Sequence, residues 1–137
     1  MRSASTFGHR ATAPLVYRIW DDSTAAEVAD ACAALWLELE AVLSPIIGVR
    51  GVIALGQRSL HLASATHPWL AVRQPDSPET LDAALLVSLL AQRSSDDAVA
   101  AGDTFLQTFH GLLSSLIGAS LTERLLRTVW GPPDPPP

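Results

Sequence analysis

The feature that constrains this chain most is a stripe of apolar residues that recur every three or four positions between residues 28 and 43. Positions with this spacing share one face of a helix of 3.6 residues per turn. Thr24 precedes the stripe and Glu27 follows Thr24 by three positions, which is typical of a capping box at a helix N-terminus. The stripe consists of Val28, Ala31, Cys32, Leu35, Leu39, Val42 and Leu43, and the opposite face of Asp30, Ala34, Leu37 and Ala41. The sequence therefore predicts an amphipathic helix that ends at Ser44-Pro45, because the residue before a proline avoids the α conformation.

A second helix is expected from Pro45 to Leu60, with its own apolar stripe. It carries three glycines, Gly48, Gly51 and Gly56, and each glycine costs a helix about 1 kcal/mol relative to alanine. Close packing against another helix is the preferred explanation for them. A turn that faces a ligand is the alternative.

Three further helices complete the pattern. The segment 78–93 is apolar on nearly all sides, so it is expected to be the central helix of the bundle or one side of an oligomer interface. A helix over 96–117 ends at Gly118. Ser120 and Glu123 then predict a second capping box, at the start of a short last helix.

These patterns predict an all-α fold, a compact bundle of about five helices in a single domain without internal repeats. A chain of 137 residues can bury a core without metals or disulfides. Residues 1–13 are small and polar and are expected to be disordered, and Pro14–Trp20 is expected to lie on the domain as an extended arm. The helical domain then covers residues 14–130, and a proline-rich tail covers 131–137.

The charge composition limits the classes of partner. The formal net charge is −5, and all nine cations are arginines. Arginine-only, alanine-rich usage is explained more simply by a GC-rich bacterial genome than by arginine-specific recognition. Because no basic stripe is found, neither nucleic acid nor an anionic membrane surface is expected as a partner. With 48% hydrophobic and only 17% charged residues, some apolar surface is expected to stay exposed or to be covered by a partner.

Cysteine usage and hydropathy indicate a cytoplasmic location. The single cysteine, Cys32, lies on an apolar stripe and is expected to be a small buried side chain in a reducing compartment. The segment from Met1 to Ala13 lacks the apolar region of a secretory signal. The longest apolar stretch, Ala83 to Ala91, is too short to span a bilayer.

No catalytic, cofactor-binding or metal-binding residue is predicted. The pairs Asp21-Asp22 and Asp96-Asp97 precede helices, where capping and dipole effects explain them. His110 lies at the polar edge of its helix and is a candidate phosphoacceptor in a histidine phosphotransfer-like bundle. That family usually has a basic residue three positions after the histidine and a glycine next to that basic residue, whereas this chain has Leu113 and Ser114 there.

Arginine and tryptophan, residue types enriched at protein interfaces, gather in two parts of the chain. The candidate interaction surface consists of Arg50, Arg58, His61, His67, Trp69, Arg124, Arg127 and Trp130. The competing interpretation is that the tryptophans anchor connections to the bundle and the arginines pair with carboxylates.

The leading hypothesis is a non-enzymatic bacterial regulatory or adaptor module that binds a protein partner, forms a homo-oligomer and needs no cofactor. The first alternative is a helical bundle that binds or converts a small molecule in a pocket between the glycine-bearing helix and Phe105 and Phe109. The second is a histidine phosphotransfer-like signalling protein that acts through His110.

Overall fold

The computed structural model describes residues 15, 22–70, 83–127 and 129, and within them it contains five α-helices and no strand. The elements are α2 (Ala25–Ile47), α3 (Val49–Ala63), the short 3-10 helix η2 (Pro68–Leu70), α4 (Ala83–Ala91), α5 (Ser95–Ile117) and α6 (Ala119–Leu126). The prediction of an all-α bundle of about five helices is confirmed. The predicted disordered segment 1–13, the proline-rich tail 131–137 and all of the predicted arm except Leu15 lie outside the described residues.

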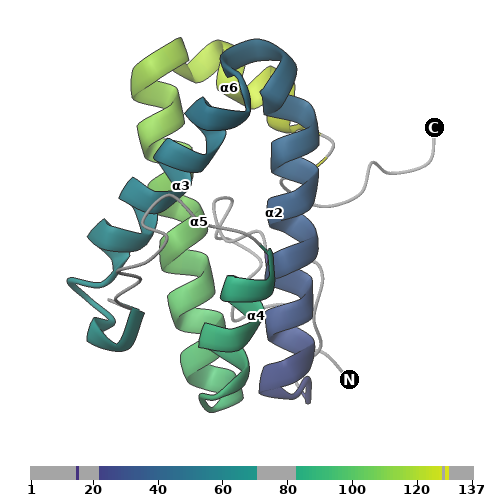
Figure 1. Cartoon of the computed structure of the whole chain (residues 1–137), viewed down its shortest axis with the longest axis vertical. Helices are drawn as coiled ribbons and strands as arrows, with labels where there is room; N and C mark the ends of the chain where they lie inside the picture. Colours follow the sequence, from purple (N-terminus) through teal and green to yellow (C-terminus); the bar gives the residue numbers. More distant parts are fainter. Residues whose placement is uncertain (1–14, 16–21, 71–82, 128, 130–137) are drawn as a thin grey trace.

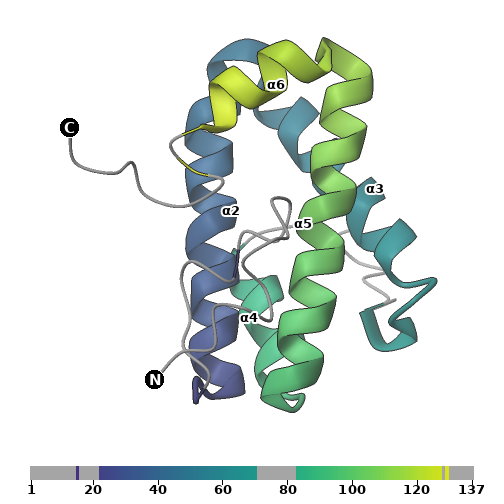
Figure 2. The ribbon, with the colours of Figure 1, turned by 180° about the vertical axis from the view of Figure 1, so that it is seen from behind.

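Two long helices, α2 and α5, form the frame of the bundle. They run in the same direction, with both N-termini at the lower end of the molecule in Figure 1. At the upper end each long helix turns sharply into a second helix, α2 into α3 and α5 into α6 (Figures 1 and 2). The shorter α4 packs mainly on α2 and also contacts α5, and α3 packs on both long helices.

The α2–α3 and α5–α6 pairs are two copies of one structural unit, because each element of the second pair begins 70 positions after its counterpart (25 and 95, 49 and 119). Both long helices have 23 residues and a hydroxyl N-cap: Thr24 accepts a hydrogen bond from the Glu27 amide, and Ser94 accepts one from the Asp97 amide. Both end at a glycine of positive φ, 85° at Gly48 and 95° at Gly118. The expectation of no internal repeat is wrong.

The duplication is faint in the sequence: residues 43–48 and 113–118 share the pattern Leu-Ser-x-x-Ile-Gly, but most buried positions keep their place and change their side chain. Trp36 in α2 corresponds to Leu106 in α5, and Cys32 corresponds to Gly102, and all four are buried. A large side chain in one unit is therefore matched by a smaller one in the other. Packing requires only that the total volume of the core be conserved.

Gly48, and not Ser44-Pro45, ends the first helix. Pro45 lies inside the last turn of α2, where its missing N–H costs a single hydrogen bond. The amide of Gly48 donates to the Ser44 carbonyl at 2.8 Å, and the next helix begins immediately at Val49. With φ 85° and ψ 154°, Gly48 has a backbone conformation that is essentially restricted to glycine. The prediction of a helix boundary at the proline is therefore wrong.

The second predicted capping box is also absent. In α6 the N-cap is Gly118, which makes no side-chain hydrogen bond, and Ser120 already lies inside the helix. The sharp turn at Gly118 leaves no room for a separate capping residue, because the chain passes directly from the end of α5 into α6. The first capping box is confirmed: the Thr24 amide donates to the Glu27 carboxylate at 2.8 Å, and the Glu27 amide donates to the Thr24 hydroxyl at 3.1 Å.

An aromatic cluster fills the space between the long helices. The ring of Trp36 meets Phe109 edge-on at a centroid distance of 5.5 Å and lies tilted against Phe105 at 5.9 Å. All three side chains are fully buried. Such aromatic pairs contribute about 0.5–1.5 kcal/mol beyond their area burial. They fix the separation of α2 and α5.

Leu15, which precedes the first unit, is buried against the long helix of the second. It packs on Gly102, where an added Cβ would lie 2.7 Å from the Leu15 side chain. Its amide donates to the buried carboxylate of Asp103 at 3.3 Å. The position 70 residues later, Leu85, belongs to α4, which packs mainly on the long helix of the first unit. Leu15 and α4, which precede the first and the second unit, thus each pack on the long helix of the other unit.

The described part of the predicted 78–93 helix is α4. Leu86 and Leu90 are buried, whereas Ala84 and Ser88 are exposed. The helix therefore packs within one chain along one face, and its remaining leucines and valine lie half-buried at the edge of the core. Among the described residues no helix combines the length and apolarity needed to cross a membrane.

Candidate functional site

The structure divides the predicted interaction surface into three parts. Arg50, Arg58 and His61 are exposed along α3. Arg124 and Arg127 are exposed at the end of α6, which packs on α5 and α2. The remaining described residues, His67 and Trp69, lie in the connection after α3, and Trp130 lies outside the described residues.

The exposed side of α3, which we call the α3 face, is the most distinctive of these parts. Its residues are Arg50, Ala54, Gln57, Arg58 and His61. No aspartate or glutamate occurs in the sequence from Ala41 to Pro75. This is unusual in a chain with fourteen carboxylates.

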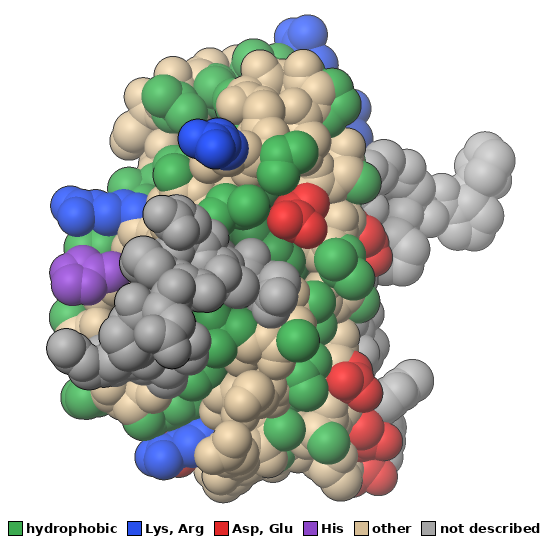
Figure 3. Space-filling model, viewed as in Figure 1, with side chains coloured by type: hydrophobic (Ala, Val, Ile, Leu, Met, Phe, Trp, Pro, Cys, Tyr) green, Lys and Arg blue, Asp and Glu red, His purple; other side chains and the backbone are tan. Residues whose placement is uncertain are grey.

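The long helices have the opposite charge. The sequence of α2 contains four carboxylates and no arginine, lysine or histidine, and that of α5 contains three carboxylates, one histidine and no arginine or lysine. In Figure 3 acidic side chains gather along the side of α2, whereas arginine and histidine side chains lie on the side of α3. On this face of the molecule the acidic side chains thus lie along α2, and α3 carries only cationic ones.

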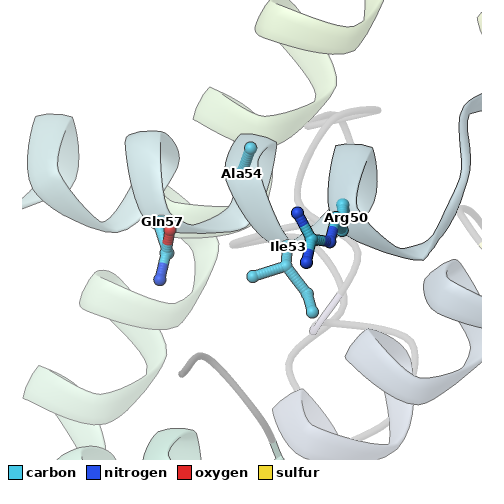
Figure 4. Close-up of a pocket in the computed structure, with 4 residues that line it drawn as sticks. All are labelled: Arg50, Ile53, Ala54 and Gln57. Atoms are coloured by element: carbon cyan, nitrogen blue, oxygen red, sulfur yellow. The ribbon is translucent and has the colours of Figure 1, made fainter. Parts of the chain in front are cut away.

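A pocket of about 500 Å³ opens on α3. The described residues that line it are Arg50, Ile53, Ala54 and Gln57, all from this one helix. Figure 4 shows Arg50 and Ile53 side by side, with Gln57 one turn further along. The pocket thus combines an aliphatic wall with a guanidinium and an amide, which suits an apolar group attached to an anionic one.

The pocket was predicted in a different place. The sequence placed it between the glycine-bearing helix and the side chains of Phe105 and Phe109. Both phenylalanines are fully buried and pack on Trp36, so side chains fill that space. The glycine-bearing helix does line a pocket, but its described lining consists of the exposed Arg50 and Ala54 and the half-buried Ile53 and Gln57 of α3.

His67 and Trp69 anchor the connection after α3 to the bundle. The hydroxyl of Thr104 on α5 donates to the Ala100 carbonyl at 2.9 Å, so it accepts from Nε2 of His67, which lies 3.2 Å away. His67 therefore has its proton on Nε2 when neutral. The guanidinium of Arg93 lies 4.6 Å from the ring centre of Trp69, a cation–π contact. His67 and Trp69 therefore anchor a connection to the bundle, which is the alternative to their being part of an interaction surface.

His110, the candidate phosphoacceptor, is half-buried on α5. Burial lowers the pKa of its imidazole below the ordinary value, and the negative charge of Glu123 on α6 partly opposes that shift. A phosphoryl group added to this ring would meet the same carboxylate. The surroundings of His110 therefore favour a neutral ring over an anionic adduct.

Cys32 is free and buried, as the sequence predicts. Burial raises the pKa of its thiol to about 12, with a smaller contribution from the charge of Asp103. The reactive thiolate is therefore scarce at neutral pH. Within the described residues no three histidine, cysteine or acidic side chains are grouped so that they could hold a metal ion.

One exposed apolar face was not recognised as a candidate site in the sequence. The outward side of α2, which we call the α2 stripe, contains Asp30, Ala34, Leu37 and Ala41, all exposed. Leu37 is 53% exposed, although it is a leucine in the middle of a long helix. The sequence did contain a signal for this face: Leu37 lies opposite the buried stripe of its helix, where an apolar residue has no partner inside the bundle.

The chain was compared with protein-family models, with curated proteins and with solved structures, and none of them matches it.

Proposed function

We propose that this chain is a non-enzymatic protein-interaction module, of the kind that serves as a regulatory adaptor, and that it binds an acidic partner through the α3 face. The observation that supports this proposal is an exposed helix with two arginines and a histidine, and no carboxylate, in a chain of net charge −5. An acidic partner is attracted to α3 because no carboxylate there offsets the cations, whereas on α6 Glu123 lies beside Arg124. The distribution of charge thus selects both the partner and its position.

Charge alone is a weak source of affinity. An exposed ion pair contributes about 0.2–1 kcal/mol, so Arg50 and Arg58 together supply only a small part of the free energy of a stable complex. The aliphatic wall of the pocket, Ile53 and Ala54, supplies apolar contact next to those charges. The partner segment that fits best is an acidic amphipathic helix with an exposed apolar side chain.

The test measures binding of a synthetic fluorescent helical peptide built from glutamate, alanine and leucine. The expected result is that the wild type binds it, and that a variant with Arg50→Ala and Arg58→Ala loses at least about tenfold in affinity. A variant with Arg124→Ala and Arg127→Ala loses the same charge from α6 and is the matched control, which should bind like the wild type. Equal loss in both variants, or none in either, contradicts the proposal.

The pocket also supports a second candidate function, the binding of a small organic anion. Its volume of about 500 Å³ lies within the range of about 300–1,000 Å³ typical of small-molecule sites. Arg50 would hold the anionic group, and Ile53 would contact the apolar part. Native mass spectrometry of the purified protein tests this: a bound anion that is lost in an Arg50→Ala variant supports it, and a ligand-free spectrum opposes it.

A further inference from the structure

We propose that the α3 face binds the α2 stripe of a second copy of this chain, with Leu37 of one copy in the pocket next to Arg50 of the other. The inference rests on the proposed function of the α3 face and identifies its acidic partner. The sequence suggested the segment 78–93 as an oligomer interface, but α4 buries its most apolar face inside its own chain. The α2 stripe and the α3 face take its place in this proposal.

Charge complementarity favours this pairing. The sequence of α2 has no cation and four carboxylates, of which Asp30 lies on the α2 stripe itself, and the sequence of α3 has two arginines and a histidine but no carboxylate. An acidic helix of the kind that fits the α3 face is thus already present in the chain. Neither helix is suited to pair with a second copy of itself, because like charges would then meet across the contact.

The spacing of surface residues also matches. The α2 stripe has the exposed positions 30, 34, 37 and 41. The α3 face includes the exposed positions 50, 54 and 61 and the half-buried position 57, so both follow the same four-three-four spacing along a helix. In an antiparallel pair Asp30 lies opposite His61, and Leu37 lies opposite Ala54, at the pocket. The small side chains of the alanines at 34, 41 and 54 permit the two helix axes to approach each other closely.

The second structural unit provides an internal comparison. The positions on α5 that correspond to Ala34, Leu37 and Ala41 are Thr104, Gln107 and Gly111. Thr104 is bonded to His67, so that face of α5 already has a partner inside the chain. Packing within the unit therefore does not require a leucine at position 37. An exposed leucine there is explained by contact with another molecule.

From their joint at Gly48, α2 and α3 diverge towards different sides of the molecule (Figures 1 and 2), and the α2 stripe and the α3 face are different surfaces. A contact between them is heterologous, because each copy offers a different surface to its two neighbours. Each copy can then bind one neighbour through α2 and another through α3. Association continues into rings or open chains and does not stop at a dimer.

The experiment is light scattering after size-exclusion chromatography, from about 10 μM to about 1 mM protein, the range in which modest interfaces form. We expect the mass of the wild type to rise with concentration past that of a dimer. Variants with Leu37→Asp or Arg50→Glu should each remain monomeric. Gln107→Asp places the same charge at the equivalent position of α5 and should behave like the wild type.

Mixing the two defective variants gives the decisive result. Leu37→Asp leaves the α3 face intact and Arg50→Glu leaves the α2 stripe intact, so the mixture should form a 1:1 dimer that grows no further. A mixture that stays monomeric overturns the proposal, as does a monomeric wild type at the highest concentration. Circular dichroism checks that each variant is folded, which is expected because both side chains are exposed.

The acidic peptide separates this proposal from the proposed function. Leu37→Asp should still bind the peptide as the wild type does, whereas Arg50→Glu should not. If the wild type binds the peptide and remains monomeric, self-association through α2 is refuted and the α3 face remains a binding surface for another protein. If the wild type neither binds the peptide nor associates, both proposals fail.

Discussion

Replacing Gly48 or Gly118 by alanine tests the turn that defines each structural unit. Both glycines have φ near 90° and ψ near 150°, values that cost other residues about 1–3 kcal/mol. An added Cβ meets nothing within 4 Å at either position, so steric clash adds nothing to that cost. Alanine also restricts the unfolded chain, which offsets about 0.4–1 kcal/mol. We therefore expect each variant to lose about 1–2 kcal/mol of unfolding free energy.

Gly111 provides the matched control, because it also has open space around its Cβ position but lies inside α5 with ordinary helical φ. Alanine is favoured over glycine in a helix by about 1 kcal/mol, so Gly111→Ala should stabilise the protein by that amount. Glycine-to-alanine substitution should thus lower the unfolding free energy where φ is positive and raise it where φ is helical.

Urea denaturation followed by circular dichroism measures all three variants. The slope m should be unchanged, since the buried surface is the same. For a domain of this size, each kcal/mol shifts the melting temperature by about 3–5 °C. Equal losses at Gly48 and Gly118 support the equivalence of the two turns. If either of these variants is as stable as the wild type, or if all three shift in the same direction, the reasoning is refuted.

Three other predictions concern buried polar groups. The raised pKa of Cys32 means that folding favours the protonated thiol, so stability should fall as pH rises from about 9 towards 12, and Cys32→Ala should flatten that fall. The lowered pKa of His110 means that folding favours the neutral imidazole, so stability should fall as pH drops below 6.5. In denaturation curves measured across that pH range, His110→Gln should remove this part of the pH dependence. Asp103→Ala removes the acceptor of the Leu15 amide and should cost about 1–3 kcal/mol, with faster hydrogen exchange at Leu15; unchanged exchange would contradict the docking of that residue.

The helices were predictable because their signals are local. The capping box at Thr24 and the 3.6-residue periodicity depend on neighbours within a few positions, and both are confirmed. The boundaries failed where two local rules compete. Pro45 predicts a helix end, but Gly48 can adopt a backbone conformation that Pro45 cannot, and the chain turns there.

The site was predictable only in part. The exposed arginines of α3 were identified from residue type, but Trp69 belongs to an internal contact with Arg93 that depends on where α4 ends in space. The pocket depends on the placement of α3 relative to the rest of the molecule, which periodicity does not specify. A search for segments without carboxylates would have found α3 from the sequence alone.

The packing of Leu15 and α4 on the long helix of the other unit has a consequence for folding. Repeat proteins in which each unit contacts only its neighbour can unfold one unit at a time. Here Leu15 completes the core against α5, and α4 completes it mainly against α2, so neither half can bury its own apolar surface. The duplicated chain should therefore unfold in one cooperative step, as a covalently linked, segment-swapped dimer does, and neither half should be stable when expressed alone.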